Sequence, residues 1–146
     1  MLYFAFGSNI DTAQMRQRCP SARVLAEALL PKHRLVFNGF SRSWGGAVAS
    51  VMRDPDADVP GLLYDLAAAD IARLDGFEGH PWVYARCARL VRLADGTQKR
   101  AQVYIHTQPE RVGKPSWRYT MTIWRAYKVR GFDDTALLDA ALAETF

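Results

Sequence analysis

Short β-like runs separated by turn residues occupy most of the chain, and they constrain its fold more than any other feature. The clearest pair is residues 84–93 and 99–106, which flank Ala94-Asp95-Gly96-Thr97. An Asp-Gly pair between two β-like runs predicts a hairpin. Further strands are expected at residues 2–6, 24–30, 33–37, 47–52 and 59–66.

Turn residues are expected to separate these strands. Gly61 lies inside a β-like run, which indicates a bulge or a close approach of another backbone segment. Breaks in the chain are predicted at Pro31, at Asn38-Gly39, at Trp44-Gly45-Gly46 and at the turn Asp54-Pro55-Asp56.

Helices are expected between and after the strands. Asp11 is placed to cap a short helix that ends near Arg18, with Gln14 in the capping-box position. Another short helix is expected at residues 67–74, one follows the capping residue Ser116, and a last one covers residues 134–143. About six strands, mostly in one block, with helices interspersed and at the end predict an α+β fold.

Length and composition exclude several classes of protein. A chain of 146 residues predicts one domain, residues 1–146. It is 49% hydrophobic and 23% charged, as globular proteins are, and its charge of +4 comes from scattered basic residues, so we expect no nucleic-acid partner. No apolar run approaches the about 20 residues of a membrane span. Two cysteines and no signal-peptide pattern predict a cytoplasmic protein with no membrane partner.

Common catalytic patterns are missing. The three histidines have no zinc-ligand spacing, Ser8 is not in a nucleophile elbow, and no phosphate-binding glycine loop occurs. Cys19 and Cys87 are expected to be packing residues rather than nucleophiles.

Two segments are poorly explained by core packing. Phe6-Gly7-Ser8-Asn9-Ile10 either presents free backbone N–H groups to a carboxylate or oxyanion, or is an ordinary strand-to-helix turn. Glu78 lies between two glycines in an expected loop among aromatic residues. Partial desolvation would raise its pKa toward neutrality, as a base requires, whereas the alternative is an exposed loop acid.

Together these segments resemble the γ-glutamylcyclotransferase-like family. The opening Tyr3-Phe4-Ala5-Phe6-Gly7-Ser8-Asn9-Ile10 is similar to that family's YFAYGSNL. The resemblance continues, in order, through Met15-Arg16-x-Arg18-Cys19-Pro20, Pro60-Gly61-x-Leu63-Tyr64, Leu74-Asp75-x-x-Glu78-Gly79 with Tyr84 and Arg86, and Lys114-Pro115-Ser116-x-x-Tyr119.

The resemblance implies a mixed β-barrel with flanking helices and no metal or organic cofactor. It also implies an intramolecular aminolysis, in which the α-amino group of a γ-glutamyl amino acid, peptide or amine attacks its own side-chain amide to give 5-oxoproline and a free amine. Glu78 matches the family's catalytic Glu. The residues expected to bind this small-molecule substrate are Phe6, Gly7, Ser8, Asn9, Ile10, Tyr84 and Tyr119, with a plain core role as the alternative for the two tyrosines.

The chain departs from the family pattern at two places. Phe6 stands where the family usually has Tyr, and Tyr127 replaces the first glycine of a C-terminal motif whose proline is also missing. We expect this second region to shape the pocket for the leaving amine. The tryptophans Trp82, Trp117 and Trp124 either line that pocket or belong to the core. The alternative function is a binding module that holds a carboxylate metabolite without chemistry, and either protein would be a monomer or homodimer.

Overall fold

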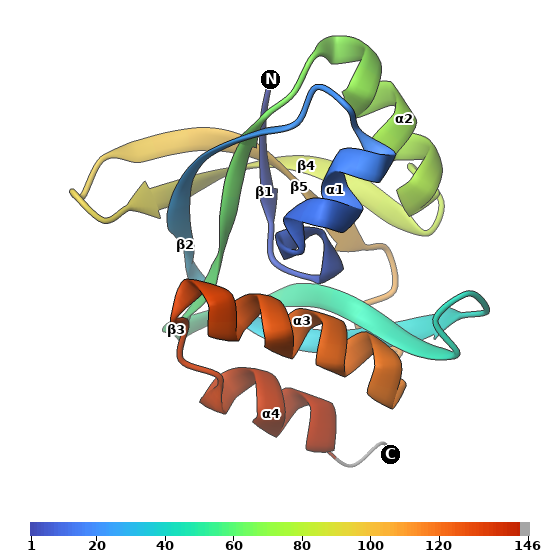
Figure 1. Ribbon diagram of the computed structural model, residues 1–146. Helices are drawn as coiled ribbons and strands as arrows, with labels where there is room; N and C mark the ends of the chain where they lie inside the picture. Colours follow the sequence, from blue (N-terminus) through green and yellow to red (C-terminus); the bar gives the residue numbers. More distant parts are fainter. Residues whose placement is uncertain (144–146) are drawn as a thin grey trace.

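Five strands close into a barrel in the computed structural model of the protein, which describes residues 1–143 (Figure 1). The strands are neighbours in the order β1-β3-β2-β4-β5. β1 (Leu2–Ala5) pairs antiparallel with β3 and parallel with β5, where Tyr3 lies opposite Gln102. This one parallel contact makes the barrel mixed, which confirms the expected α+β class with a mixed β-barrel, although with five strands rather than about six.

The prediction of several short strands between residues 24 and 66 is wrong. β2 (Arg23–Ser41) and β3 (Gly46–Asp65) form one long antiparallel hairpin. Pro31 pairs with Asp58 and His33 with Arg53, so the expected break at Pro31 and the expected turn at residues 54–56 face each other in a single irregularity. A bulge of this kind accommodates a missing amide donor without ending the strand, because the ladder resumes beyond it.

The hairpin around Asp95-Gly96 is confirmed. β4 (Tyr84–Leu93) and β5 (Gln98–His106) pair along their whole length, and Gly96 takes the positive φ of +85° that the turn needs. The close approach expected at Gly61 is also present. A Cβ atom at Gly61 would lie 2.2 Å from the carbonyl oxygen of Ala5, so β1 and β3 can meet there only because the side chain is missing.

The first helical region connects β1 to β2. A single 3-10 turn, η1 (Ser8–Ile10), leads into α1 (Thr12–Arg18). Asp11 caps α1 as predicted, since its carboxylate accepts hydrogen bonds from the amides of Ala13 and Gln14. The capping box is not formed, because the Gln14 side chain instead donates to the side chains of Ser8 and Asn9.

α2 (Ala68–Glu78) extends four residues further toward the C-terminus than the sequence predicts. The helix continues through Asp75 and Gly76 and ends only at Gly79, which takes the left-handed conformation that closes helices (φ +68°). Glu78 is therefore the last residue of a helix and not a loop residue, which corrects the expectation. A helix holds this side chain more rigidly than a loop would.

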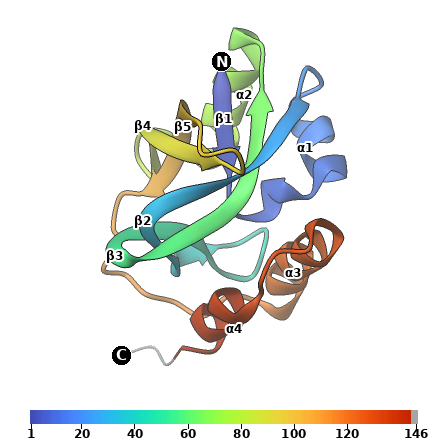
Figure 2. The ribbon, with the colours of Figure 1, turned by 90° about the vertical axis from the view of Figure 1, so that its left-hand side faces the viewer.

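α3 (Trp117–Arg130) and α4 (Thr135–Leu142) lie next to each other on one side of the barrel, away from α2 (Figures 1 and 2). Ser116 caps α3 as predicted, because its hydroxyl accepts from the Tyr119 amide. α3 ends at Gly131 and α4 packs Leu137 into the core. Within residues 1–143, no helix has the length and apolar character needed to cross a bilayer.

Candidate active site

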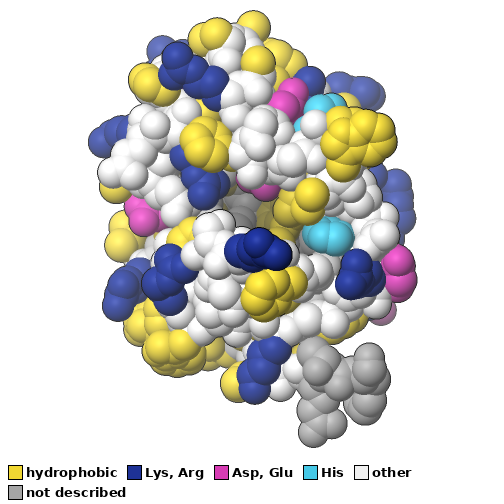
Figure 3. Space-filling model, turned by 90° about the vertical axis from the view of Figure 1, so that its right-hand side faces the viewer, with side chains coloured by type: hydrophobic (Ala, Val, Ile, Leu, Met, Phe, Trp, Pro, Cys, Tyr) yellow, Lys and Arg dark blue, Asp and Glu magenta, His cyan; other side chains and the backbone are white. Residues whose placement is uncertain are grey.

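Glu78 and the loop at residues 6–9 open onto the same cavity, although 68 positions separate them in the sequence. The cavity has a volume of about 360 Å³ and reaches the surface as a hollow near the centre of one face, edged by hydrophobic, basic and histidine side chains (Figure 3). β1 delivers the loop to it, and the last turn of α2 delivers Glu78. This volume suits a small metabolite.

The loop is fixed by hydrogen bonds to the Asn9 side chain. Its amide nitrogen donates to the Tyr3 hydroxyl (3.0 Å), and its amide oxygen accepts from Gln14 Nε2 and Arg18 Nη1 (both 3.1 Å). The Tyr64 hydroxyl donates to the Asn9 carbonyl (2.7 Å). A side chain that is held at every polar atom gives the loop a single conformation.

The turn leaves backbone donors free beside the cavity. Within residues 1–143, the amides of Gly7, Ser8 and Asn9 have no hydrogen-bond acceptor, as the first amides of a helical turn ordinarily lack one. Ile10, which the resemblance predicts to bind substrate, does not line this cavity. Its amide bonds back to Gly7, and its side chain is buried against α3 rather than in this cavity, because the 3-10 turn rotates it away.

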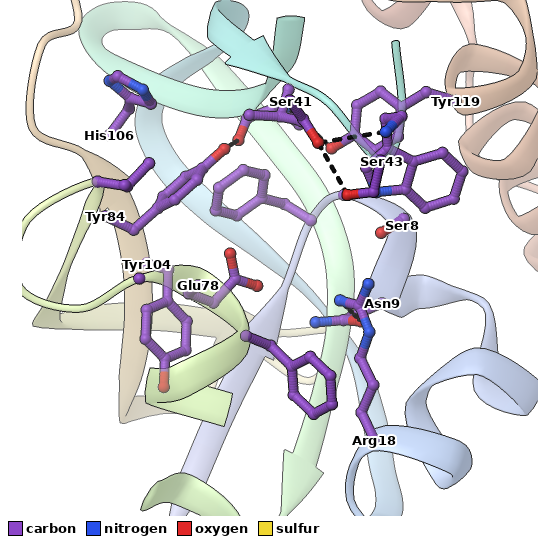
Figure 4. A pocket seen from close by; sticks show the side chains of 18 of the residues that line it. Ser8, Asn9, Arg18, Ser41, Ser43, Glu78, Tyr84, Tyr104, His106 and Tyr119 are labelled. Carbon is purple, nitrogen blue, oxygen red and sulfur yellow. Dashed lines mark hydrogen bonds between the residues drawn. The ribbon is translucent and has the colours of Figure 1, made fainter. Parts of the chain in front are cut away.

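Glu78 points its carboxylate into the open centre of the cavity, with Asn9 and Arg18 on one side and Tyr84 and Tyr104 on the other (Figure 4). Glu78 as a residue is half-buried, but protein atoms surround its carboxyl group. This burial raises the pKa of Glu78 from its ordinary 4.5 to about 7, and the Arg18 charge opposes part of the increase. Near neutral pH the group can therefore both accept and donate a proton.

The turn that carries Glu78 is anchored to the barrel through Asp75. This carboxylate accepts from the Tyr104 hydroxyl (2.6 Å) and pairs with Arg86 Nε (2.9 Å). The Asp75 carbonyl also accepts from the amide of His80 (2.9 Å). Both side-chain partners come from the β4–β5 hairpin, so the end of α2 is tied to two strands of the barrel wall.

Tyr84 and Tyr119 both line the cavity, and both contact the backbone of Ala49. The Tyr84 hydroxyl donates to the Ala49 carbonyl (2.7 Å), which uses its proton. The Tyr119 hydroxyl accepts from the Ala49 amide (2.9 Å), and its own proton has no acceptor within the described part of the chain. Burial raises the pKa of both phenols, so they stay protonated at neutral pH.

Phe6 lines the cavity as expected, but other lining residues are not predicted from the sequence. Arg18 is one of them, and the only sequence signal for it is its place in a stretch that carries the family resemblance. Trp44, from the connection between β2 and β3, also lines it. The other tryptophans, Trp82, Trp117 and Trp124, do not line the cavity. Trp82 and Trp117 are largely exposed, so neither expectation holds for them, whereas Trp124 packs against the core, the alternative predicted for it.

Metal-binding groups are not gathered at this cavity. Across residues 1–143, no three His, Cys, Asp or Glu side chains are placed to hold a metal ion together. His106, which lines the cavity beside Tyr84, keeps a lowered pKa because it is desolvated, and its Nδ1 accepts from the Gln108 amide (3.0 Å). It is therefore a neutral group at pH 7.

Known proteins are similar to this chain in sequence and in fold. Residues 3–126 match the family described as "Gamma-glutamyl cyclotransferase, AIG2-like". The chain is 31% identical to the gamma-glutamylcyclotransferase of Mus musculus over 135 aligned residues. This alignment covers 89% of this chain and 71% of the relative. The protein of the same name from Homo sapiens is 29% identical over the same shares of the two chains.

Solved structures extend the likeness to three dimensions. A structure named "Gamma-glutamyl cyclotransferase" superposes with a TM-score of 0.88 at 25% identity, covering all of this chain and 89% of that one. YkqA from Bacillus subtilis shares the fold, with a TM-score of 0.72 at 21% identity over 88% of this chain and 48% of its own. The family expected from the resemblance is confirmed, and with it membership of an enzyme family. The chain belongs to the γ-glutamyl cyclotransferase, AIG2-like family.

Proposed function

We propose that the protein cyclises γ-glutamyl amino acids, peptides or amines to 5-oxoproline, with Glu78 as the general acid–base. The observation that carries this proposal is the convergence on one cavity of Glu78, with a pKa of about 7, and the amides of Gly7, Ser8 and Asn9, which have no acceptor within residues 1–143. A base and an oxyanion-binding group in the same small cavity are the two requirements of acyl transfer.

Glu78 moves protons between the two nitrogens of the substrate. Its carboxylate takes a proton from the α-ammonium group, and the free amine then attacks the γ-carbonyl carbon. The new C–N bond pushes the carbonyl electrons onto oxygen. When the tetrahedral intermediate collapses, the bond to the leaving nitrogen breaks and Glu78 donates its proton to that nitrogen. After its attack the ring nitrogen carries two protons. One of them passes to the regenerated Glu78 carboxylate and from there to water. Proton transfer of this kind contributes about 10²–10⁴-fold to the rate.

The loop amides stabilise the charge that develops on oxygen. Donors that are already oriented need no rearrangement during the reaction, and losing one such donor costs roughly 3 kcal/mol. The Tyr119 hydroxyl, whose proton has no acceptor within residues 1–143, lies beside the loop amides. A Cβ atom built on Gly7 would be 3.4 Å from the Tyr119 hydroxyl oxygen. Since the attack is intramolecular, the cavity mainly has to hold the glutamyl chain in a folded shape.

The alternative function, carriage of a carboxylate metabolite without chemistry, expects Glu78 to face bulk water. Glu78 instead lines the cavity beside the loop amides, where burial raises its pKa to about 7, a property that carriage of a metabolite does not require. This favours the enzyme over the binding module.

The direct test measures 5-oxoproline released from a panel of γ-glutamyl amino acids and γ-glutamyl amines. Glu78→Gln should lower kcat at least about 10²-fold, because the amide cannot take up the proton. Glu27→Gln, a change of the same kind at an exposed position on β2, should leave turnover unchanged. Full activity of Glu78→Gln, or no 5-oxoproline from any member of the panel with the unaltered protein, would refute the proposal.

Four further expectations stay predictions. They are a single domain over residues 1–146, a monomer or homodimer, a cytoplasmic location and the absence of nucleic-acid and membrane partners. Light scattering would measure the oligomeric state, and a binding assay at two salt concentrations would detect any affinity for nucleic acid.

A further inference from the structure

Arg18 is the one Lys or Arg among the described residues that line the cavity. Its guanidinium donates to Asn9 Oδ1 (3.1 Å) and lies 5.2 Å from the centre of the Phe77 ring. These two contacts fix the direction of the side chain without neutralising its charge. Within residues 1–143, Arg18 forms no ion pair with a carboxylate in the absence of substrate.

We propose that Arg18 binds the α-carboxylate of the γ-glutamyl group. This inference rests on the proposed function, in which every substrate carries this carboxylate whatever its leaving group. The planar guanidinium has several N–H donors and only one is used by Asn9, so others are free for a carboxylate. A partly enclosed cavity strengthens the attraction between the two charges.

The position of Arg18 relative to Glu78 agrees with the shape of the substrate. The α-carboxylate and the α-amino group are attached to the same carbon atom, so their binding groups must be neighbours. Arg18 is close enough to Glu78 to lower its pKa, and both lie beside Asn9 in Figure 4. Holding the carboxylate at Arg18 therefore directs the amine toward the Glu78 carboxylate.

Among the described residues, the far side of the cavity has no charged group comparable to Arg18 for an anion. Figure 4 places His106 across the cavity from Arg18, and His106 is neutral at pH 7. Arg118 is already engaged outside the cavity, with its guanidinium 4.6 Å from the centre of the Trp44 ring and hydrogen-bonded to the Ser43 carbonyl. The α-carboxylate is thus assigned to the Arg18 side, and the leaving group to the side of His106.

The experiment compares two ligands that differ only in the α-carboxylate. One is a γ-glutamyl amine, and the other is the corresponding N-substituted 4-aminobutanamide, which lacks the carboxylate. Competitive inhibition constants measure the binding of the second compound whether or not it is turned over. If the unaltered protein turns over neither compound, equilibrium titration gives the dissociation constants of both. The proteins are the unaltered chain, Arg18→Gln, Arg18→Lys and the control Arg16→Gln, which changes an exposed residue of the same helix.

The unaltered protein and Arg16→Gln should bind the γ-glutamyl ligand about 10- to 100-fold more tightly than the analogue. In Arg18→Gln this preference should fall to about threefold or less, with a larger change in KM than in kcat at high pH. Arg18→Lys should be intermediate, because it keeps the charge but not the planar donors.

An unchanged preference in folded Arg18→Gln would overturn the inference, even if the pH profile moved, because Arg18 would then only tune Glu78. If Arg18→Gln does not fold, an unreduced preference in Arg18→Lys would overturn it as well. Failure of the proposed function is a separate result. It would appear as absent 5-oxoproline release by the unaltered protein, while the binding preference would still report on Arg18.

Discussion

Tyr84 and Tyr119 both hydrogen-bond the backbone of Ala49, one as a donor and the other as an acceptor. Tyr84 donates its hydroxyl proton to the Ala49 carbonyl, and Tyr119 accepts a proton from the Ala49 amide. Both residues are tyrosines, both are buried, and burial raises the pKa of both phenols. They differ in the one property that matters for binding, because only Tyr119 has a hydroxyl proton left for a ligand.

Removing the two hydroxyl groups should therefore have different effects. Tyr119→Phe loses a donor beside Gly7, and we expect kcat/KM to fall about 10- to 100-fold. Tyr84→Phe loses only a structural hydrogen bond, and we expect about 1 kcal/mol lower stability with a smaller loss of activity. Steady-state kinetics and urea unfolding of both variants check this. A larger kinetic effect for Tyr84→Phe would contradict it.

The pH dependence of activity should report the ionisation of Glu78. The base must be ionised to accept a proton, and burial raises its pKa to about 7, so kcat/KM should rise with pH and reach its half-value near pH 7. Arg18→Gln should move this midpoint to higher pH, because the Arg18 charge lowers the pKa of Glu78. Arg16→Gln serves as the control, and a midpoint near pH 4.5 would rule out a desolvated Glu78.

The same burial should make Glu78 a source of instability at high pH. The folded protein holds the proton of Glu78 more tightly than the unfolded chain does, so this stabilisation is complete below about pH 4.5 and is lost as the pH rises through about 7. Glu78→Gln imitates the protonated form. We expect it to be about 1–3 kcal/mol more stable than the unaltered protein at pH 8 and equal to it near pH 4, as measured by urea unfolding.

The anchor of α2 should affect turnover through the position of Glu78. Asp75→Asn weakens the contacts with Arg86 and Tyr104, and we expect a lower kcat together with about 1–3 kcal/mol lower stability. Asp58→Asn is the matched control, because the exposed Asp58–Arg92 pair lies elsewhere on the surface and contributes less than about 1 kcal/mol. Equal kinetic effects of the two variants would show that Asp75 does not position Glu78.

Two glycines should respond in opposite ways to the addition of a methyl group. In Gly61→Ala the new Cβ would meet the Ala5 carbonyl at 2.2 Å and the Phe4 ring at 2.6 Å, so we expect a loss of about 3 kcal/mol or more. Gly76 lies in α2 with no atom within 4 Å of such a Cβ. Gly76→Ala should stabilise the protein by up to about 1 kcal/mol, which thermal unfolding would show.

Local signals in the sequence predicted local structure well. The Asp95-Gly96 turn, the caps Asp11 and Ser116, and the close approach at Gly61 each depend on a residue and its immediate neighbours. Predictions failed where distant pairing decided the outcome. Pro31 and residues 54–56 each read as the end of a strand, but they face each other, and together they form one bulge within a continuous hairpin.

The candidate site divides in the same way. Glu78 and the loop at residues 6–9 were found from their residue types and from the family resemblance. The helical position of Glu78 and the cavity contacts of Arg18 and Trp44 were not. No spacing in the sequence relates a helix end to a hairpin connection, so only the folded chain shows that these residues share a cavity.

The sequence by itself determined the Asp95-Gly96 turn, the caps Asp11 and Ser116 and the family, and it singled out Glu78 as the candidate proton-carrying acid, because short-range sterics and residue chemistry govern these features. Closure of the barrel decided the rest. It buried Glu78 enough to raise its pKa, placed Arg18 beside it, and gave two similar tyrosines different hydrogen-bonding roles. These properties depend on desolvation and on contacts between distant segments, which exist only once the strands have paired.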